Sequence, residues 1–220
     1  MISGLECPLI LDIGANLGAY SIPLAKHIQK IGGKVIGFEP QRIVYYQLCG
    51  NIVLNRFDNY EAIYNALGED FGFADIPEID YEVSSNIGAF SLDKKFRQLH
   101  GIEISIKKAI NKVSMIKLDG VEVERAPALI KIDVEGYELN VLRGGINFLD
   151  KHDYPPILFE AWNFDWFVED KSQLMTFISE LGYKVTNIGS SDWVAQHPRN
   201  QREISFQADG KGAINLSRIR

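Results

Sequence analysis

Residues 11–18 read LDIGANLG, and residues 36–40, further along the chain, read IGFEP. The first segment predicts a strand that enters a glycine turn and then a helix, and the second predicts a strand that ends on Glu39. Gly14 and Gly18 have no Cβ, so backbone N–H groups in such a turn can approach a ligand closely. A carboxylate at the tip of the second strand can accept both hydroxyls of a ribose. Together the segments predict a nucleoside-type cofactor at the C-terminal edge of a parallel sheet.

The residues of this turn favour one cofactor over another. A dinucleotide fingerprint needs a further glycine, and the position between Gly14 and Gly18 that would complete it is Asn16. Asp12 stands at the strand end, where its charge would repel a pyrophosphate and attract an ammonium or sulfonium group. S-adenosylmethionine carries both cations and no phosphate, and is therefore favoured over NAD. The alternative, that Asp12 only caps the turn and Gly14 only permits it, stays open.

Length and charge set the broad class of the protein. A chain of 220 residues suits a single α/β domain over residues 1–220, and its net charge is −6. A protein that binds a nucleic-acid backbone shows clustered Lys and Arg, so a nucleic-acid partner is disfavoured. Cys7 and Cys49 indicate no disulfide framework, and no apolar run approaches the roughly 18 residues of a membrane span. We therefore expect a soluble, cytoplasmic protein.

Strand and helix patterns alternate along the chain, which predicts a parallel sheet with helices on both faces. We therefore expect an open, doubly wound α/β sheet of seven core strands, whose order the sequence does not reveal. Residues 68–112 are less regular and are predicted as an insert, with short strands at 71–76 and, after it, 113–117. Within 41–55, the predicted buried residues are Val44, Leu48, Ile52 and Val53. The expected strands are 8–13, 34–39, 60–67, 129–133, 156–161, 183–188 and 193–196, and the expected helices are 20–31, 41–55, 134–149 and 168–181.

A third block, residues 129–138, reads LIKIDVEGYE. With residues 11–21 and 37–40, it resembles the FkbM-like methyltransferases, a class I S-adenosylmethionine-dependent group, and residues 51–55 and 157–160 agree more weakly. The third block is the most specific, because class I methyltransferases in general share only the first two. The resemblance covers about residues 8–185. It implies a Rossmann-like, seven-stranded, mostly parallel sheet with the last strand antiparallel, and methyl transfer to oxygen, often of a sugar or a natural product.

The resemblance also implies a set of cofactor-binding residues. Asp12, Gly14, Asn16 and Gly18 would surround the amino-acid moiety, and Glu39 would hold the ribose. Family members usually have helical material before the first strand, whereas about seven residues precede it here, so we expect any lid over the cofactor to be incomplete. The remaining residues of the predicted set are Tyr20 and Pro40 in the same two blocks, Asn65 and Ala66 beside adenine, and Ser85 and Asn86 in the following loop.

The predicted chemistry needs few groups from the protein. Methyl transfer is an in-line displacement with an activated leaving group, so the protein mainly positions the reactants. An alcohol acceptor also needs a general base, and Asp133, Glu135 and Glu160 end strands at the edge where ligands bind in open α/β sheets. The same carboxylates suit a divalent cation, and the need for a metal stays open. Asp133 and Glu135 could instead stabilise the following helix through its dipole, a role that suits Glu138 better.

Two other features near this edge carry an expectation. Residues 162–167 read WNFDWF, a run that could stack on a sugar ring, although packing beneath a helix is favoured. Lys131 stands in the middle of an apolar strand, and is expected to pair with a carboxylate or to extend toward the sheet end.

The first functional hypothesis is therefore an S-adenosylmethionine-dependent O-methyltransferase that acts on a small molecule or glycan. An NAD-type oxidoreductase and a non-catalytic S-adenosylmethionine-binding module are the alternatives. A nucleic-acid methyltransferase is disfavoured by the acidic charge and by the absence of an Asn-Pro-Pro-Tyr type motif after residues 129–133. The acceptor, the metal dependence and the oligomeric state do not follow from the sequence.

Overall fold

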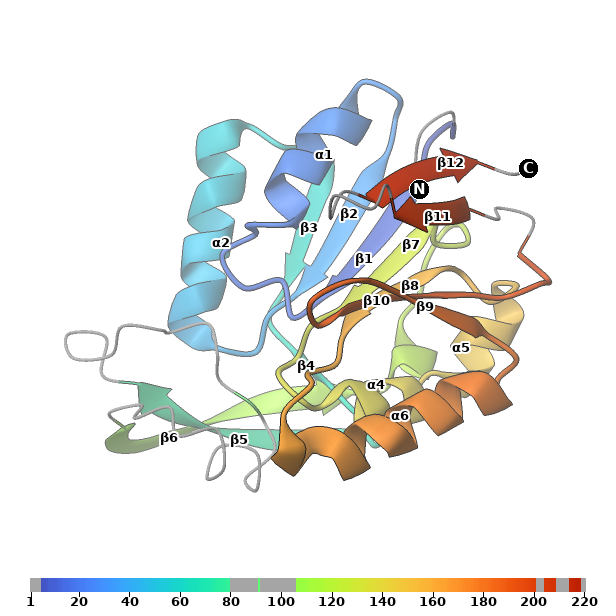
Figure 1. Ribbon diagram of the computed structural model, residues 1–220. Helices are drawn as coiled ribbons and strands as arrows, with labels where there is room; N and C mark the ends of the chain where they lie inside the picture. The colour runs from blue at the N-terminus through green and yellow to red at the C-terminus, as the bar shows by residue number, and fades with distance from the viewer. Residues whose placement is uncertain (1–4, 80–90, 92–105, 201–203, 209–213, 219–220) are drawn as a thin grey trace.

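The computed structural model describes residues 5–79, 91, 106–200, 204–208 and 214–218, and a seven-stranded sheet lies at its centre (Figure 1). Five neighbouring strands are parallel, and β10 is antiparallel to both of its neighbours. This confirms the expected Rossmann-like sheet, in which the last strand along the chain is antiparallel. Across the sheet the order is β3 (Tyr60–Ile63), β2 (Lys34–Phe38), β1 (Leu9–Ile13), β7 (Leu129–Ile132), β8 (Ile157–Glu160), β10 (Asp192–Gln196) and β9 (Lys184–Gly189).

Helices cover both faces of this sheet, as the alternating pattern predicted (Figure 1). Ile10 of the central strand packs into one core with Ala25 and Leu48, whereas its neighbour Leu11 packs into the other core with Val141. Successive residues of β1 therefore supply two separate cores, as expected for a strand buried on both faces. The first core is covered by α1 (Ser21–Gln29) and α2 (Arg42–Asn55), and the second by α4 (Glu138–Arg143), α5 (Ile146–Lys151) and α6 (Val168–Glu180).

The predicted strand 60–67 is divided between two sheets. β3 ends at Ile63, and the chain turns so that Ala66 and Leu67 pair with another strand instead. This turn carries Asn65 and Ala66 over the end of the main sheet. The second sheet has the order β4 (Ala66–Leu67), β6 (Ile106–Ile116) and β5 (Gly72–Ile79), and short 3-10 turns follow at Leu118–Gly120 and Asp165–Phe167.

Three further features differ from the sequence-based expectation. The helix predicted over 134–149 is divided into two helices, with Gly144 and Gly145 between them. At Gly144 the backbone lies so close to Gly68 that a Cβ would be 2.0 Å from its carbonyl oxygen. Val53 is 74% exposed rather than buried, since the buried face of α2 follows Val44 and Leu48 at helical spacing. A two-stranded hairpin of β11 (Ile204–Ala208) and β12 (Ile214–Arg218) was not predicted.

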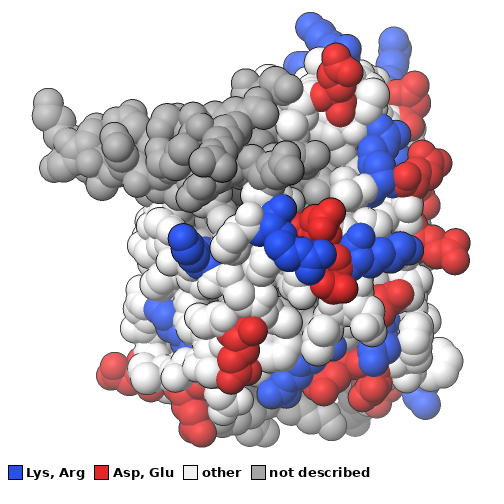
Figure 2. All heavy atoms as spheres, turned by 90° about the vertical axis from the view of Figure 1, so that its right-hand side faces the viewer, with Lys and Arg blue, Asp and Glu red and all other residues white. Residues whose placement is uncertain are grey.

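Three observations concern the helices, the thiols and the surface charge of the protein. Within the described residues, no helix is long and apolar enough to cross a membrane. Cys7 and Cys49 are free thiols. On the face that Figure 2 shows, acidic and basic side chains are interspersed rather than separated into patches of one sign.

Candidate functional site

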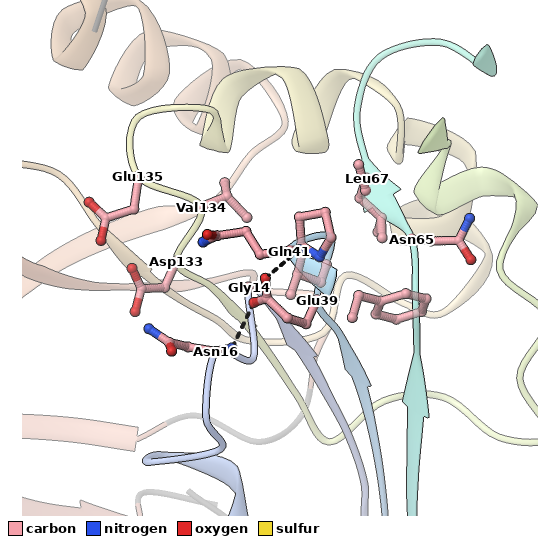
Figure 3. Close-up of a pocket in the computed structure, with 13 residues that line it drawn as sticks. Gly14, Asn16, Glu39, Gln41, Asn65, Leu67, Asp133, Val134 and Glu135 are labelled. Atoms are coloured by element: carbon pink, nitrogen blue, oxygen red, sulfur yellow. Dashed lines mark hydrogen bonds between the residues drawn. The ribbon is translucent and has the colours of Figure 1, made fainter. Parts of the chain in front are cut away.

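A pocket opens at the C-terminal ends of β1, β2 and β7 (Figure 3). The chain leaves β1 toward β2 on one side, while β7 pairs with β1 on the other side. The strand order therefore reverses beside β1, and such a switch point is where open α/β sheets bind their ligands. The pocket is lined by Ile13, Gly14, Asn16, Phe38, Glu39, Pro40, Gln41, Asn65, Ala66, Leu67, Asp133, Val134 and Glu135.

The turn after β1 forms one wall of the pocket. Gly14 has φ +79°, and a Cβ there would lie 1.9 Å from the carbonyl oxygen of Asp133, so only glycine fits. The N–H groups of Gly14 and Ala15 both donate to the carbonyl oxygen of Phe38, at 3.0 and 2.9 Å. The N–H of Asn16 donates to Glu39 Oε2 at 2.9 Å. These three N–H groups are thus used within the protein, contrary to the expectation that the turn would offer them to a ligand.

Glu39 directly follows β2, and both of its carboxylate oxygens accept hydrogen bonds from the backbone. It is 4% exposed, and its two carboxylate oxygens accept N–H donors from Asn16 at 2.9 Å and from Gln41 at 2.8 Å (Figure 3). A carboxylate has about four acceptor positions, so acceptor capacity remains on both oxygens. Burial raises the pKa of Glu39 to about 7, although the two backbone N–H groups oppose the shift. A neutral diol that donates two hydrogen bonds would suit this group.

The wall opposite the glycine turn comes from the divided strand. Ala66 and Leu67 are buried and form an apolar part of the lining there, whereas the side chain of Val134, also in the lining, lies beside Gly14. Asn65 also lines the pocket, but its Nδ2 donates to the carbonyl oxygen of Ser114 at 3.1 Å, and Figure 3 shows its amide pointing away from Glu39. This region therefore offers the flat apolar surface that a heterocyclic base prefers, rather than a side-chain amide.

Beneath the turn, a buried ion pair joins β1 to β7. Lys131 Nζ lies 3.0 Å from Asp12 Oδ1 and 3.3 Å from Asp133 Oδ2, and it donates to the carbonyl oxygen of Gly14 at 3.0 Å. Burial alone would lower the pKa of Lys131, but Asp12 and Asp133 outweigh it and hold that pKa above its ordinary value. The prediction that Lys131 pairs with a carboxylate is confirmed. Asp12 has no exposed surface and does not line the pocket, so its charge is directed to Lys131.

The loop after β7 brings several carboxyl groups together. Glu135 adopts φ +55°, an uncommon conformation for a residue with a side chain. Burial, with added repulsion from Asp133 and Glu160, raises the pKa of Glu135 to about 8. Glu138 is buried and accepts the N–H groups of Val134 and Gly136, so it stabilises this loop at the start of α4. That is the role the sequence favoured for Glu138, whereas Asp133 and Glu135 face the pocket.

Glu160 is the one predicted catalytic carboxylate outside the pocket lining. It ends β8 and accepts a hydrogen bond from Ser191 Oγ at 2.6 Å, and its place opposite Asp192 is set by the pairing of β8 with β10. Burial raises its pKa, with Asp133 adding repulsion while Ser191 opposes the shift. Among the described residues, no group of three or more His, Cys, Asp or Glu side chains is arranged to hold a metal ion.

The aromatic run after β8 divides between packing and exposure. Phe167 is buried, and Trp162 meets it edge to face at 5.3 Å between ring centroids. Phe164 is 48% exposed and stacks on Trp166 at 5.5 Å. Most of this run therefore packs against the core, as the sequence favoured, and Phe164 remains at the surface.

The pocket gathers most but not all of the residues predicted for it. Asp12, Gly18, Tyr20 and Glu160 lie outside its lining, and Ser85 and Asn86 lie outside the described residues. The sequence analysis did not predict five lining residues: Ile13, Phe38, Gln41, Leu67 and Val134. Gln41 and Val134 adjoin Pro40 and Asp133 in the sequence, so extending each motif by one residue would have found them. Those brought together as predicted are Gly14, Asn16, Glu39, Pro40, Asn65, Ala66, Asp133 and Glu135.

Comparisons with known proteins agree with this architecture. A family model, the methyltransferase FkbM domain, matches residues 12–185. The curated protein Methyltransferase sdnD from Sordaria araneosa is 27% identical over 158 residues, or 62% of this chain and 60% of that protein. The crystal structure of methyltransferase FkbM from Methylobacillus flagellatus KT has a TM-score of 0.55 at 20% identity, covering 88% of this chain and 46% of that one. The chain thus spans less than two thirds of either relative, and the crystal structure shows likeness of fold.

Proposed function

We propose that this chain, which belongs to the FkbM methyltransferase family, is an S-adenosylmethionine-dependent methyltransferase that acts on oxygen. The acceptor in this proposal is a hydroxyl group of a sugar, a glycan or a small natural product. The proposal joins the family membership to the chemistry of the pocket at the ends of β1, β2 and β7, and it is argued below from the polar groups of that pocket.

One observation carries the choice of cofactor. The N–H groups of Gly14, Ala15 and Asn16 are all bonded within the protein, so this turn offers no anion site for a pyrophosphate. Glu39 keeps acceptor capacity beside the same turn. A nucleoside that brings a diol and no phosphate fits this combination, whereas a dinucleotide does not. This supports S-adenosylmethionine over NAD.

The remaining lining fits the other parts of that cofactor. We assign the ribose diol to Glu39, the base to the apolar lining residues Ala66 and Leu67, and the cationic groups to the neighbourhood of Asp133. The negative charge of Asp133 would attract an ammonium and a sulfonium in a partly dry site. When bound, S-adenosylmethionine supplies a methyl group that is already activated on a sulfonium sulfur.

For the chemical step we assign the general base to Glu135, with Asp133 beside it. The acceptor oxygen forms a bond to the methyl carbon as the carbon–sulfur bond breaks, and the hydroxyl proton passes to a carboxylate of the protein. The pKa of Glu135, raised to about 8 mainly by burial, places it close to working pH. Below that pH Glu135 is protonated and cannot accept a proton, so we expect turnover to rise as the pH increases toward 8.

The proposal is tested by following a labelled methyl group. The protein is incubated with methyl-labelled S-adenosylmethionine and pairs of acceptors, each a sugar or polyol natural product with its O-methylated analogue. We expect label on the free hydroxyl compounds only. Glu135→Gln should lower the rate by about 100-fold or more, as is typical of a lost general base, whereas the exposed control Glu122→Gln should leave it unchanged. Label on nitrogen or carbon, or equal label on the blocked analogues, would contradict O-methylation.

A further inference from the structure

Lys131 is the residue whose contacts the proposed chemistry does not use. It stands directly opposite Asp12 in the register of β7 with β1. Its ammonium group has three donors, and three oxygens surround it: Asp12 Oδ1 at 3.0 Å, the carbonyl of Gly14 at 3.0 Å and Asp133 Oδ2 at 3.3 Å. These acceptors come from the end of β1, from the turn that follows it and from the end of β7.

Its setting protects this arrangement from solvent. The side chain of Lys131 is 9% exposed, and the Tyr20 ring lies 5.9 Å from Nζ on the outer side. Neutralising the charge of Asp12 requires only one of the three contacts that Lys131 Nζ makes. The other two, to Gly14 and Asp133, join two neighbouring segments that both line the pocket. These contacts satisfy the donors of the ammonium group and at the same time fix two residues of the pocket lining.

We propose that Lys131 is a positioning residue of the cofactor site, which joins the turn after β1 to Asp133 after β7 and so assembles the pocket before a ligand arrives. The inference rests on the proposed function, because it assumes that Asp133 faces the bound cofactor. Lys131 Nζ contacts one carboxylate oxygen of Asp133 and the carbonyl oxygen of Gly14, both in the pocket lining, while Lys131 itself is not a lining residue. Preorganisation of this kind improves affinity because less order is lost on binding.

Double-mutant cycles on the binding of S-adenosylmethionine test this role. Calorimetry measures Kd for the wild type, Lys131→Met, Asp133→Asn and the double variant. We expect each single change to weaken binding about 10- to 100-fold, the size of a charge-assisted hydrogen bond. We expect the double variant to bind no worse than the weaker single variant, because Lys131 acts through Asp133. The control Lys34→Met removes an exposed lysine paired with Glu61 at the far end of β2 and should change Kd less than threefold.

Lys131→Met leaves Asp12 buried without its partner, and this single variant is expected to be less stable. The same double-mutant cycle is therefore also measured in an Asp12→Leu background, where the buried carboxylate of Asp12 is absent from all four proteins. Amide hydrogen exchange at Gly14 and Gly136 without ligand gives a second readout, and it should be faster once Lys131 is replaced.

The outcomes separate the inference from the function on which it rests. If the wild type does not bind S-adenosylmethionine, the proposed function fails and the inference falls with it. If the wild type binds and the two losses multiply in both backgrounds, Lys131 does not act through Asp133 and the inference alone is wrong. A Lys131→Met variant that binds like the wild type would overturn it in the same way.

Discussion

The β1/β2 side of the pocket and the β7/β8 side differ in how their polar groups are partnered. On the first side, the N–H groups of the glycine turn and both oxygens of Glu39 have defined partners within the protein. On the second side, Asp133, Glu135 and Glu160 raise one another's electrostatic energy, and Glu135 has an uncommon backbone conformation. A recognition surface benefits from fixed geometry, whereas acid–base chemistry benefits from a carboxyl group whose pKa is near working pH.

The largest effect is expected from a substitution in the glycine turn, on the β1/β2 side of the pocket. Gly14→Ala places a Cβ 1.9 Å from the Asp133 carbonyl oxygen and forces a side chain onto φ +79°. We expect a loss of about 3 kcal/mol in the free energy of unfolding, from crowding and backbone strain together. Denaturant unfolding measures it.

The matched control for that change is Gly50→Ala in α2. No atom lies within 4 Å of the Cβ that this substitution would add. Since alanine favours a helix interior over glycine, Gly50→Ala should stabilise the protein by about 0.5–1 kcal/mol. Similar losses for the two variants would show that the turn after β1 is not a tight contact.

The carboxyl groups on the β7/β8 side should make the stability of the protein depend on pH. The folded pKa of Glu135 is about 8 and its ordinary value is 4.5. Between these values the unfolded chain has lost its proton while the folded chain keeps it, so the stabilisation present at low pH is lost as the pH rises toward 8. Glu135→Gln removes this term and should flatten the dependence by an amount on the order of 2 kcal/mol between pH 5 and 8.

Unfolding at several pH values measures this dependence, and Glu122→Gln, at an exposed position, is the control. An unchanged slope in Glu135→Gln would mean that the loop after β7 does not bury its carboxyl groups. Burial also raises the pKa of Glu39 to about 7 and that of Glu138 to about 8, so in the Glu135→Gln variant stability should still fall as the pH rises, but less steeply.

The smallest effect on cofactor binding is expected at Glu160, at the edge of the β7/β8 side. Glu160 lies outside the pocket lining and accepts from Ser191 Oγ, and glutamine can still accept that hydrogen bond. Glu160→Gln should therefore change the Kd for S-adenosylmethionine by less than about threefold, as for a substitution away from the site. A loss of more than tenfold would return Glu160 to the candidate site and would extend the pocket toward β8.

Local motifs were predictable from the sequence, and contacts between distant segments were not. Gly14, Asn16 and Glu39 line one pocket, and each could be selected from the sequence because it lies within one short segment at a strand end. The partner of Asp12 depends on the register of β1 with β7, which no local pattern shows, so Asp12 was assigned to the cofactor and not to Lys131. A strand end indicates an edge of the sheet but not the direction of the side chain, and Glu160, which ends β8, lies outside the pocket lining.

The most direct test of the account is the titration of S-adenosylmethionine and, separately, NAD into the wild type and Glu39→Ala, with Glu61→Ala as an exposed carboxylate control. The account predicts that the wild type binds S-adenosylmethionine and not NAD. It also predicts that Glu39→Ala loses about 1.5–3 kcal/mol of binding free energy, the range for hydrogen bonds to a charged group, while Glu61→Ala loses none. Binding of NAD in preference, or equal binding of S-adenosylmethionine by the wild type and Glu39→Ala, would contradict it.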